Sequence, residues 1–368
     1  MNVPTPAAIS APLTLAHGAA WTNRFALAPL TNTQSNPDGT LSDDELHWLE
    51  ARGRGGTGLV MTCATYVVPA GQAWGGQLGI SSDAHLPGLT RLADALRATG
   101  TVSSVQLHHG GRRADPALSG RPNQCPWDDP RTDSVAMTTS EVEESVQDFV
   151  AAAVRAETAG FDGVEVHGAH GYLVCQFLDP RHNDRTDQYG GSMENRSRML
   201  MEILAGIRAA TGPDFQLGLR LTPEGNGLTV AEGVEVATLV LDSGLLDYLD
   251  MSLWDVFMPP RGDVGAGQDG RLLIDHFTGL ERGETRLGVA GKVLSAADAA
   301  WCLDRGADFV SVGMGAILHH DFAARSIADA GFAAVAPPVT REHLAAEHVG
   351  RDFVDYLATG WDGLVSGG

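Results

Sequence analysis

Phe161-Asp-Gly-Val-Glu-Val-His-Gly-Ala-His-Gly-Tyr-Leu-Val-Cys-Gln-Phe-Leu178 begins with a short apolar segment, residues 163–166, and continues into a polar cluster. The cluster consists of His167, His170 and Tyr172, whose side chains can donate hydrogen bonds or carry protons. In parallel α/β proteins, ligands bind where loops leave the carboxyl ends of the strands. The stretch therefore predicts a parallel α/β fold with a ligand site at this strand end.

Plainer interpretations of the same residues stay open. A histidine at a strand end is often only a hydrogen-bonded turn residue, and Tyr172 before Leu173 could simply cap the next helix. His167 and His170 could also be two metal ligands, although no third histidine, cysteine or carboxylate is obviously placed to join them. The combination of three such groups within six positions favours a functional site.

Composition and charge narrow the class of protein. The chain has 368 residues, 43% of them hydrophobic, and 46 acidic against 25 basic residues give a formal charge of −21. This acidity argues against nucleic-acid and anionic membrane partners, which need clustered Lys and Arg. The four cysteines form no C-x-x-C pair, and we find no signal peptide and no apolar run long enough to span a membrane. We expect a cytoplasmic protein.

Apolar strands alternate with helical segments along most of the chain, and each predicted strand is followed by a predicted helix. The eight predicted strands are residues 25–30, 58–62, 102–107, 163–166, 215–221, 248–252, 287–290 and 309–312. This pattern predicts one α/β domain over residues 1–368, a (β/α)8 TIM barrel. A doubly wound open sheet is the alternative, but eight units without a domain break would make a very wide sheet.

Several segments lie outside the repeating pattern. Residues 13–21 predict a hairpin around His17-Gly18 that could close the bottom of the barrel. The excursion at 108–139, rich in Pro, Asp, Arg and Gly, is too long for a plain connection and predicts a lid or subdomain. Ser42–Glu45 and Ser140–Glu143 predict capping boxes, and a polar tail helix is expected at about 341–357.

If the chain is a barrel, its site consists of strand-end residues. Gln106 offers one donor and one acceptor, which suits the edge of a pyrimidine-like ring. Arg220 lies inside the apolar strand Leu217–Leu221 and needs a negative partner, either a nearby Asp or Glu or an anionic ligand. Gly291, Gly313 and Gly315 follow the last two strands, where such barrels bind phosphate. No G-x-G-x-x-G motif follows the first strand, so a Rossmann domain is not expected.

Together these residues resemble the Old Yellow Enzyme family of FMN-dependent NAD(P)H:alkene oxidoreductases. The resemblance runs from about residue 13 to residue 321 and is most specific in two blocks, Gly160–Leu173 and Asn183–Arg196. Asn23–Thr31 and Val105–Arg112 match two further signatures of that family. The chain ends soon after the barrel, so we expect it not to be one of the larger relatives with an iron–sulfur cluster and a second nucleotide domain.

The resemblance implies a role for each strand end. Tightly but non-covalently bound FMN would contact Ala28, Pro29, Leu30, Thr31, Ala64, Gln106 and Arg220 through its ring, and Gly291, Lys292, Gly313 and Met314 at its phosphate. His167 and His170 would hold the carbonyl or nitro oxygen of the substrate, with Trp254 beside them. Tyr172 would donate the proton. Met314 stands where the family usually has Arg, and Thr31 where part of it has Cys, so FMN affinity and flavin potential stay undecided.

The resemblance implies an NAD(P)H-dependent, ping-pong reductase of activated C=C bonds, with small activated alkenes as its partners. NADPH or NADH would be the hydride donor, and monomer or homodimer is left undecided. One rival is a metal-dependent barrel hydrolase or lyase that uses His167 and His170 as ligands. Another is a flavin-binding barrel without turnover of its own. Met314 is the only sequence feature that favours this alternative.

Overall fold

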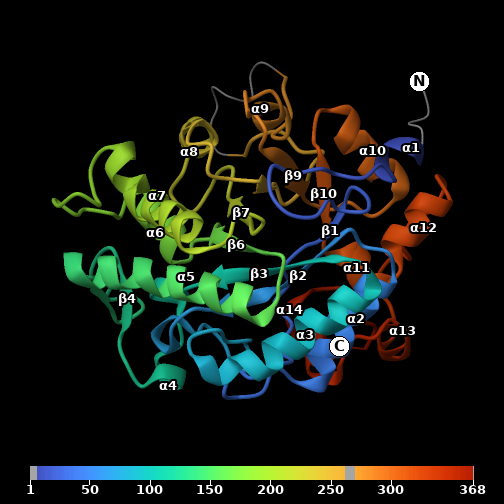
Figure 1. Ribbon diagram of the computed structural model, residues 1–368, viewed down its shortest axis with the longest axis horizontal. Coiled ribbons are helices and arrows are strands. Elements are labelled where there is room, and N and C mark those ends of the chain that lie inside the picture. Colours follow the sequence, from blue (N-terminus) through green and yellow to red (C-terminus); the bar gives the residue numbers. More distant parts are fainter. Residues whose placement is uncertain (1–5, 262–269, 368) are drawn as a thin grey trace.

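The computed structural model describes residues 6–261 and 270–367 (Figure 1). Eight parallel strands close into a barrel in the order β1-β10-β9-β8-β7-β6-β3-β2, which confirms the predicted (β/α)8 fold. The strands are β1 (Phe25–Leu27), β2 (Leu59–Tyr66), β3 (Val102–His108), β6 (Gly163–Gly168), β7 (Gln216–Leu221), β8 (Tyr248–Ser252), β9 (Arg286–Ala290) and β10 (Phe309–Val312).

Helices surround the barrel, as Figure 1 shows for α2, α3 and α5 in front of the sheet. Apart from the excursion after β3 and the C-terminal segment, the helices between and after the barrel strands are α2 (Asp43–Arg54), α3 (Leu86–Thr99), α5 (Thr139–Ala159), α6 (Leu173–Leu178), α7 (Met193–Ala210), α8 (Val230–Asp242), α9 (Asp275–Thr278), α10 (Ala296–Asp304), α11 (Met314–Leu318) and α12 (Phe322–Ala328). A short helix α1 (Pro6–Ile9) precedes the barrel. Among the described residues, no helix is both long enough and apolar enough to cross a lipid bilayer.

Nearly every residue of the barrel strands is buried, because helices cover the outside and side chains fill the inside. Continuous apolar runs therefore mark these strands in the sequence. The interior leaves little space: a Cβ atom on Gly218 would lie 2.1 Å from the Tyr248 ring, and one on Gly288 would lie 2.1 Å from the Phe309 ring. Glycine at these two positions makes room for the interior aromatic side chains.

The predicted N-terminal hairpin closes the lower end of the barrel. Leu13 and Trp21 pair through two backbone hydrogen bonds of 3.0 and 2.9 Å. The Trp21 indole is fully buried between Tyr248 and Phe309, with ring centres 5.3 and 4.8 Å away, and its Nε1 donates to Gln216 Oε1. These partners lie at the first residues of their strands, so the predicted plug is confirmed.

Two predicted capping boxes need correction. Helix α5 begins at Thr139, after the N-cap Thr138, which forms a complete capping box with Glu141; the predicted box at Ser140 does not form. Ser42 does cap α2, but the second half of its box is missing. The Glu45 carboxylate turns inward instead, where it accepts hydrogen bonds from Asn32 and Ser35.

The predicted tail helix at 341–357 is also wrong in its extent. It consists of two helices, α13 (Arg341–Ala346) and α14 (Arg351–Gly360), separated by four residues. Helix α14 is held above the strand ends because Gly350 donates its N–H to Gln34 Oε1, and Thr33 donates to the Asp352 carbonyl. The chain therefore returns to the barrel top after leaving it.

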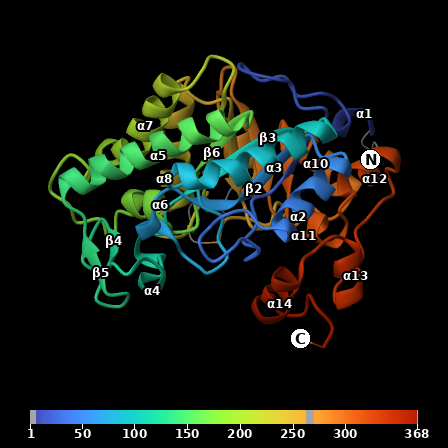
Figure 2. The same cartoon turned by 60° about the horizontal axis from the view of Figure 1, so that its bottom comes forward.

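The excursion after β3 has its own secondary structure. It contains a 3-10 turn (Gly111–Arg113), α4 (Pro116–Ser119) and a two-stranded sheet, β4 (Asn123–Cys125) with β5 (Ser134–Ala136). Figure 2 shows this excursion and α14 extending to the same side of the barrel. The excursion leaves the end of β3, and hydrogen bonds tie α14 to the segment after β1, so both lie near the side where a barrel site forms.

Candidate active site

Four rings meet where β3 and β6 end: His108, His167, His170 and Tyr172. The His108 ring centre lies 4.3 Å from that of Tyr172 and 5.4 Å from that of His167, and His167 lies 5.0 Å from His170 and 5.1 Å from Tyr172. All four contacts are edge to face. The structure thus brings together the three predicted residues and adds His108, which alternation along β3 places on the same face as Gln106.

Hydrogen bonds fix which nitrogen carries the proton in two of these imidazoles. His167 Nδ1 accepts the N–H of Ala169 at 3.2 Å, so its proton is on Nε2. Gln77 Oε1 accepts the Ala73 N–H, so the Gln77 amide nitrogen is the donor to His108 Nδ1 at 3.1 Å. His108 Nε2 then carries a proton too, and this buried N–H has no partner among the described residues.

His170 is held by its neighbours on β7 and β8. Its backbone has a left-handed φ of 61°, and its N–H donates to Thr222 Oγ1 at 2.7 Å. Its Nε2 lies 2.8 Å from Ser252 Oγ, which also accepts a bond of 3.4 Å from Arg220 Nη2. With Arg220 donating to Ser252, the hydroxyl hydrogen is directed to His170 Nε2, which puts the imidazole proton on Nδ1.

These imidazoles are neutral at pH 7. Burial lowers the pKa of His167 far below its ordinary value, and the neighbouring His170 and Arg220 lower it further. Burial likewise lowers the pKa of His170 to about 3, again with help from Arg220. The pKa of His108 is also lowered far, chiefly by burial. The cluster consequently presents uncharged N–H donors.

Tyr172 keeps its proton in this environment. Burial raises the pKa of its phenol above the ordinary value, while the Arg113 charge opposes that shift and Tyr356 adds to it. Arg113 comes from the excursion and Tyr356 from α14. Neither was predicted from the sequence, and the Val105–Arg112 signature ends one residue short of Arg113.

Arg220 on β7 is the register partner of His167 and has guanidinium donors left unused by the described residues. Its side chain is buried, and Nη1 lies 3.6 Å from Asp250 Oδ2, an ion pair too long for a good hydrogen bond. Within the described part of the chain, Nε and Nη1 have no hydrogen-bond partner. The sequence left two alternatives for Arg220, a carboxylate partner in the protein or an anionic ligand. The structure has the carboxylate partner, Asp250, and it also leaves guanidinium donors that suit a planar anionic group.

The other predicted ring contacts lie near this edge. Gln106 donates from Nε2 to Glu165 Oε1 at 2.7 Å, so one amide N–H is already used. The remaining predicted contacts follow β1 or lie in β2: Ala28 and Ala64 are buried, and Pro29, Leu30 and Thr31 are half-buried. These contacts thus come from the β1 and β2 segments, and Arg220 comes from β7 on the other side of the barrel.

Gly291 and Gly313, the two glycines predicted to contact the phosphate, have different surroundings. A Cβ on Gly291 would lie 2.7 Å from the Asp255 backbone nitrogen, so packing alone demands glycine there. A Cβ on Gly313 would meet only ordinary contacts, with Leu30 at 3.4 Å, so that glycine leaves open space beside the backbone. The Lys292 ammonium already has a partner, because its Nζ pairs with Asp255 Oδ2 at 3.0 Å.

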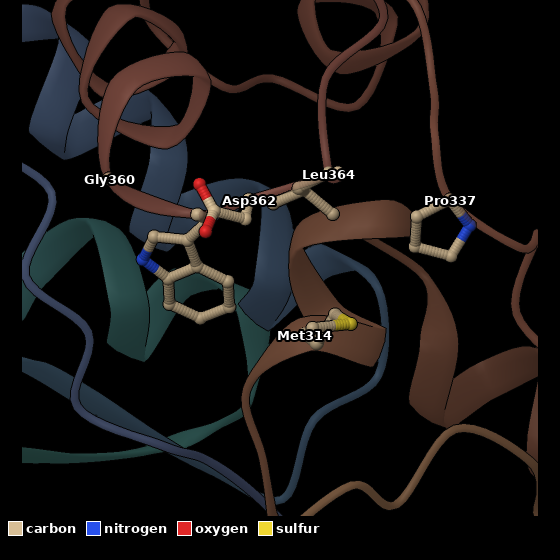
Figure 3. Close-up of a pocket in the computed structure, with 7 residues that line it drawn as sticks. Met314, Pro337, Gly360, Asp362 and Leu364 are labelled. Atoms are coloured by element: carbon tan, nitrogen blue, oxygen red, sulfur yellow. The ribbon is translucent and has the colours of Figure 1, made fainter.

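Two cavities flank the strand ends. One of about 310 Å³ lies between Met314 and the C-terminal residues Pro337 and Gly360–Leu364, as Figure 3 shows. The other, of about 530 Å³, is lined by Trp254, which is 54% exposed, with a left-handed φ of 62°. The Trp254 ring lies 5.2 Å from His170. Trp254 therefore connects the second cavity to the ring cluster.

The described residues contain one group of side chains with metal-ligand spacing, His319, Asp321 and Glu347. His319 Nε2 accepts the Val335 N–H at 3.0 Å, which leaves Nδ1 protonated and directed at Glu347, 3.7 Å away. A protonated nitrogen is not a metal ligand. His167 and His170 belong to no such group.

Comparisons with known proteins agree with this geometry. Residues 9–264 match the sequence model of the NADH:flavin oxidoreductase / NADH oxidase family. The chain is 36% identical over 314 residues to the "Probable NADH-dependent flavin oxidoreductase YqiG" of Bacillus subtilis, covering 82% of this chain and 83% of that protein. It is 31% identical over 353 residues to an NADH:acrylate oxidoreductase of Vibrio harveyi, covering 91% of this chain and 34% of that protein.

Comparison with a solved structure supports the same fold and the same family. The Old Yellow Enzyme homologue from Zymomonas mobilis superimposes with a TM-score of 0.77 at 25% identity, covering 92% of this chain and 96% of that one. This chain therefore spans about a third of the Vibrio relative but nearly the whole of the Zymomonas structure.

Proposed function

The chain belongs to the NADH:flavin oxidoreductase / NADH oxidase family, the family of Old Yellow Enzyme, and on that premise we propose that it reduces activated C=C bonds with FMN. NADH or NADPH supplies the hydride, and the alkene is an α,β-unsaturated carbonyl or nitro compound. The two half-reactions share one site by a ping-pong mechanism. One observation carries the proposal: two neutral imidazole donors and a protonated phenol meet beside an arginine with free donors.

The residues present fit FMN. The unpaired Nε and Nη1 of Arg220 supply donors for the ring edge at N1, where reduced flavin carries negative charge. The open backbone at Gly313, which precedes the N–H groups of α11, suits a phosphate. In this proposal Ala28, Pro29, Leu30, Thr31, Ala64 and Gln106 face the ring. When bound, FMN would supply the hydride chemistry that connects the nicotinamide to the alkene.

His167 and His170 hold the substrate oxygen in this proposal. His167 offers Nε2–H, and the Arg220–Ser252 chain makes Nδ1–H the donor of His170. Because both imidazoles are neutral, each offers one N–H to the oxygen while its other nitrogen accepts a hydrogen bond from the protein. Hydrogen bonds that strengthen as charge grows on that oxygen favour the transition state over the ground state.

Tyr172 supplies the proton that the α-carbon needs. Its raised pKa keeps the phenol protonated at neutral pH, and its ring packs against His108 and His167, beside the oxygen donors. The nearby Arg113 charge stabilises the phenolate that remains after transfer. Water from solvent then returns the proton. Trp254 borders the same space and is proposed to contact the substrate.

The direct test is an anaerobic visible spectrum of the purified protein, before and after NADPH and then after 2-cyclohexenone. We expect an oxidised-flavin band that NADPH bleaches and the enone restores. A band that never bleaches would leave the family and cofactor in place and remove the reductase activity. A band that bleaches but is not restored by enone or nitroalkene would remove the substrate class alone.

A further inference from the structure

Inside the barrel, below the ring cluster, three charged side chains lie on consecutive strands: Glu165 on β6, Arg220 on β7 and Asp250 on β8. They are 1%, 5% and 1% exposed. Arg220 and Asp250 are partners in the strand register, and His167, two residues after Glu165, is the register partner of Arg220. The three groups therefore form one charged layer directly under the site.

The layer contains two carboxylates and one cation. Asp250 Oδ2 lies 3.6 Å from Arg220 Nη1 and accepts a bond of 3.0 Å from Ser311, while Oδ1 has no hydrogen-bond partner in the described residues. Glu165 Oε1 accepts only the neutral amide of Gln106, and no described cation forms an ion pair with Glu165. Two ionised carboxylates would leave one buried negative charge without compensation, which is strongly unfavourable.

The groups around the layer decide which carboxylate takes a proton. Burial, with the Asp250 charge adding to its effect, raises the pKa of Glu165 to about 8, although Arg220 and Gln106 oppose the shift. Burial also raises the pKa of Asp250, but Arg220 and Ser311 both favour its ionised form. Tyr248 adds no charge, since burial and Glu165 keep its phenol protonated, and His167 above is neutral.

We propose that Glu165 and Asp250 hold one proton between them, carried by Glu165, and that this proton sets the charge beneath the flavin. With Glu165 protonated, the layer is neutral: Asp250 balances Arg220. With Glu165 ionised, the layer carries a net negative charge under the ring edge where reduced flavin also carries one. The inference rests on FMN binding, and it does not require that the alkene be the substrate.

Two consequences follow for the bound flavin. Below about pH 8 the layer is neutral, so Glu165 does not oppose flavin reduction. Above about pH 8, reduction draws one additional proton onto Glu165, because the new negative charge raises its proton affinity. The midpoint potential therefore falls more steeply with pH above this point, by one additional proton for each two-electron reduction. Glu165 acts as a positioning residue for charge, and it does not touch substrate.

The test compares FMN-loaded wild type with Glu165→Gln, which mimics the protonated side chain and keeps a partner for Gln106. At pH 7 the wild-type minus variant infrared difference spectrum should show the C=O band of a protonated carboxylic acid. Glu45, another fully buried glutamate, is common to both proteins and cancels. The pH profile of the midpoint potential, measured with a chemical reductant, should lose its steeper limb above pH 8 in the variant.

Two further variants keep the result decisive. Asp148→Asn removes a carboxyl on α5 whose pKa burial and Glu144 raise to about 6, and it should change neither the pH 7 band nor the potential. Asp250→Asn should move the loss of the Glu165 band to lower pH, which provides a test if Glu165→Gln does not fold. No carboxylic band in the difference spectrum, or an unchanged potential profile, overturns the proposal. Neither readout uses NADPH or an alkene, so a failed reductase assay would leave this test standing.

Discussion

The guanidinium of Arg113 lies 4.5 Å from the centre of the Tyr172 ring, and its Nη1 donates a hydrogen bond of 2.5 Å to the carbonyl of His170. A residue of the excursion thus fixes the loop that carries two of the proposed catalytic groups. It also places a positive charge beside the phenol, where that charge opposes the rise in the Tyr172 pKa caused by burial.

Replacing Arg113 by Gln should slow the alkene half-reaction by about two- to fivefold, because an exposed cation over an aromatic ring contributes roughly 0.5–1 kcal/mol. Flavin reduction by NADPH should change little. Stopped-flow absorbance of each half-reaction measures both rates. Arg121→Gln, an exposed arginine elsewhere in the excursion, is the matched control. Equal slowing of both half-reactions would place Arg113 in nicotinamide binding instead.

Replacing Tyr172 by Phe should slow the alkene half-reaction by roughly a hundredfold or more, the range that general acids contribute, and leave flavin reduction intact. Single-turnover reoxidation by 2-cyclohexenone reports the first rate and bleaching by NADPH the second. Tyr189→Phe removes a buried phenol that bonds Glu202 away from the site and should have no effect on either. A proton donor other than Tyr172 is indicated if reoxidation stays fast.

A phenol is a suitable probe of the oxygen site, because its oxygen can accept hydrogen bonds from the same two imidazole N–H groups. Replacing both His167 and His170 by Ala should weaken the binding of a phenol strongly, since both neutral donors are lost. His182→Ala, which changes a partly exposed histidine, should not. Titration of the flavin spectrum with a para-substituted phenol measures the dissociation constant, and unchanged binding in the double variant would end the oxygen-holding role.

Ser252 provides a finer test of the same site. Ser252→Ala removes the group that bonds His170 Nε2 at 2.8 Å, so the imidazole is free to change tautomer and orientation. Loss of one hydrogen bond, about 1 kcal/mol, should weaken phenol binding about fivefold. Ser243→Ala, at the end of α8, is the control. A phenol affinity that is unaffected by Ser252→Ala would mean that His170 is oriented by its backbone alone.

The sequence was sufficient for the barrel and for part of the site, and the reason is locality. Each strand is buried on both faces, so it appears as one apolar run, and His167, His170 and Tyr172 fall within six residues of one strand end. Arg113 and Tyr356 reach the same site through the excursion and α14. No local pattern states which side chain of a long segment returns to the barrel.

Helix ends show the same limit. Thr138 and Ser140 each begin a local pattern that suits a capping box, with Glu141 and Glu143 three residues later. The structure selects Thr138, and the next residue, Thr139, donates to Asp187 in a different loop. That tertiary contact is invisible in the local sequence, and so is the contact of Gly350 with Gln34 that separates α13 from α14.

Acid stability provides a last prediction, from His109. Its side chain is buried, its Nδ1 accepts the Gly111 N–H at 3.0 Å, and burial lowers its pKa to about 4. An unfolded histidine titrates near 6.5. Between about pH 6.5 and 4 the unfolded chain therefore binds the proton that the folded chain refuses, so stability falls as the pH falls, by up to about 3 kcal/mol for this group.

Urea unfolding at pH 7.5, 6 and 5 measures this loss. His109→Gln removes the titration, so its stability should depend less on pH than that of wild type, even though it starts lower at pH 7.5. The buried His108, His167 and His170 retain their own share of the acid loss in this variant, since their pKa values are lowered in the same direction. His182→Gln should keep the wild-type slope. Identical slopes for wild type and His109→Gln would mean that His109 accepts a proton in the folded protein, through a local opening at the start of the excursion.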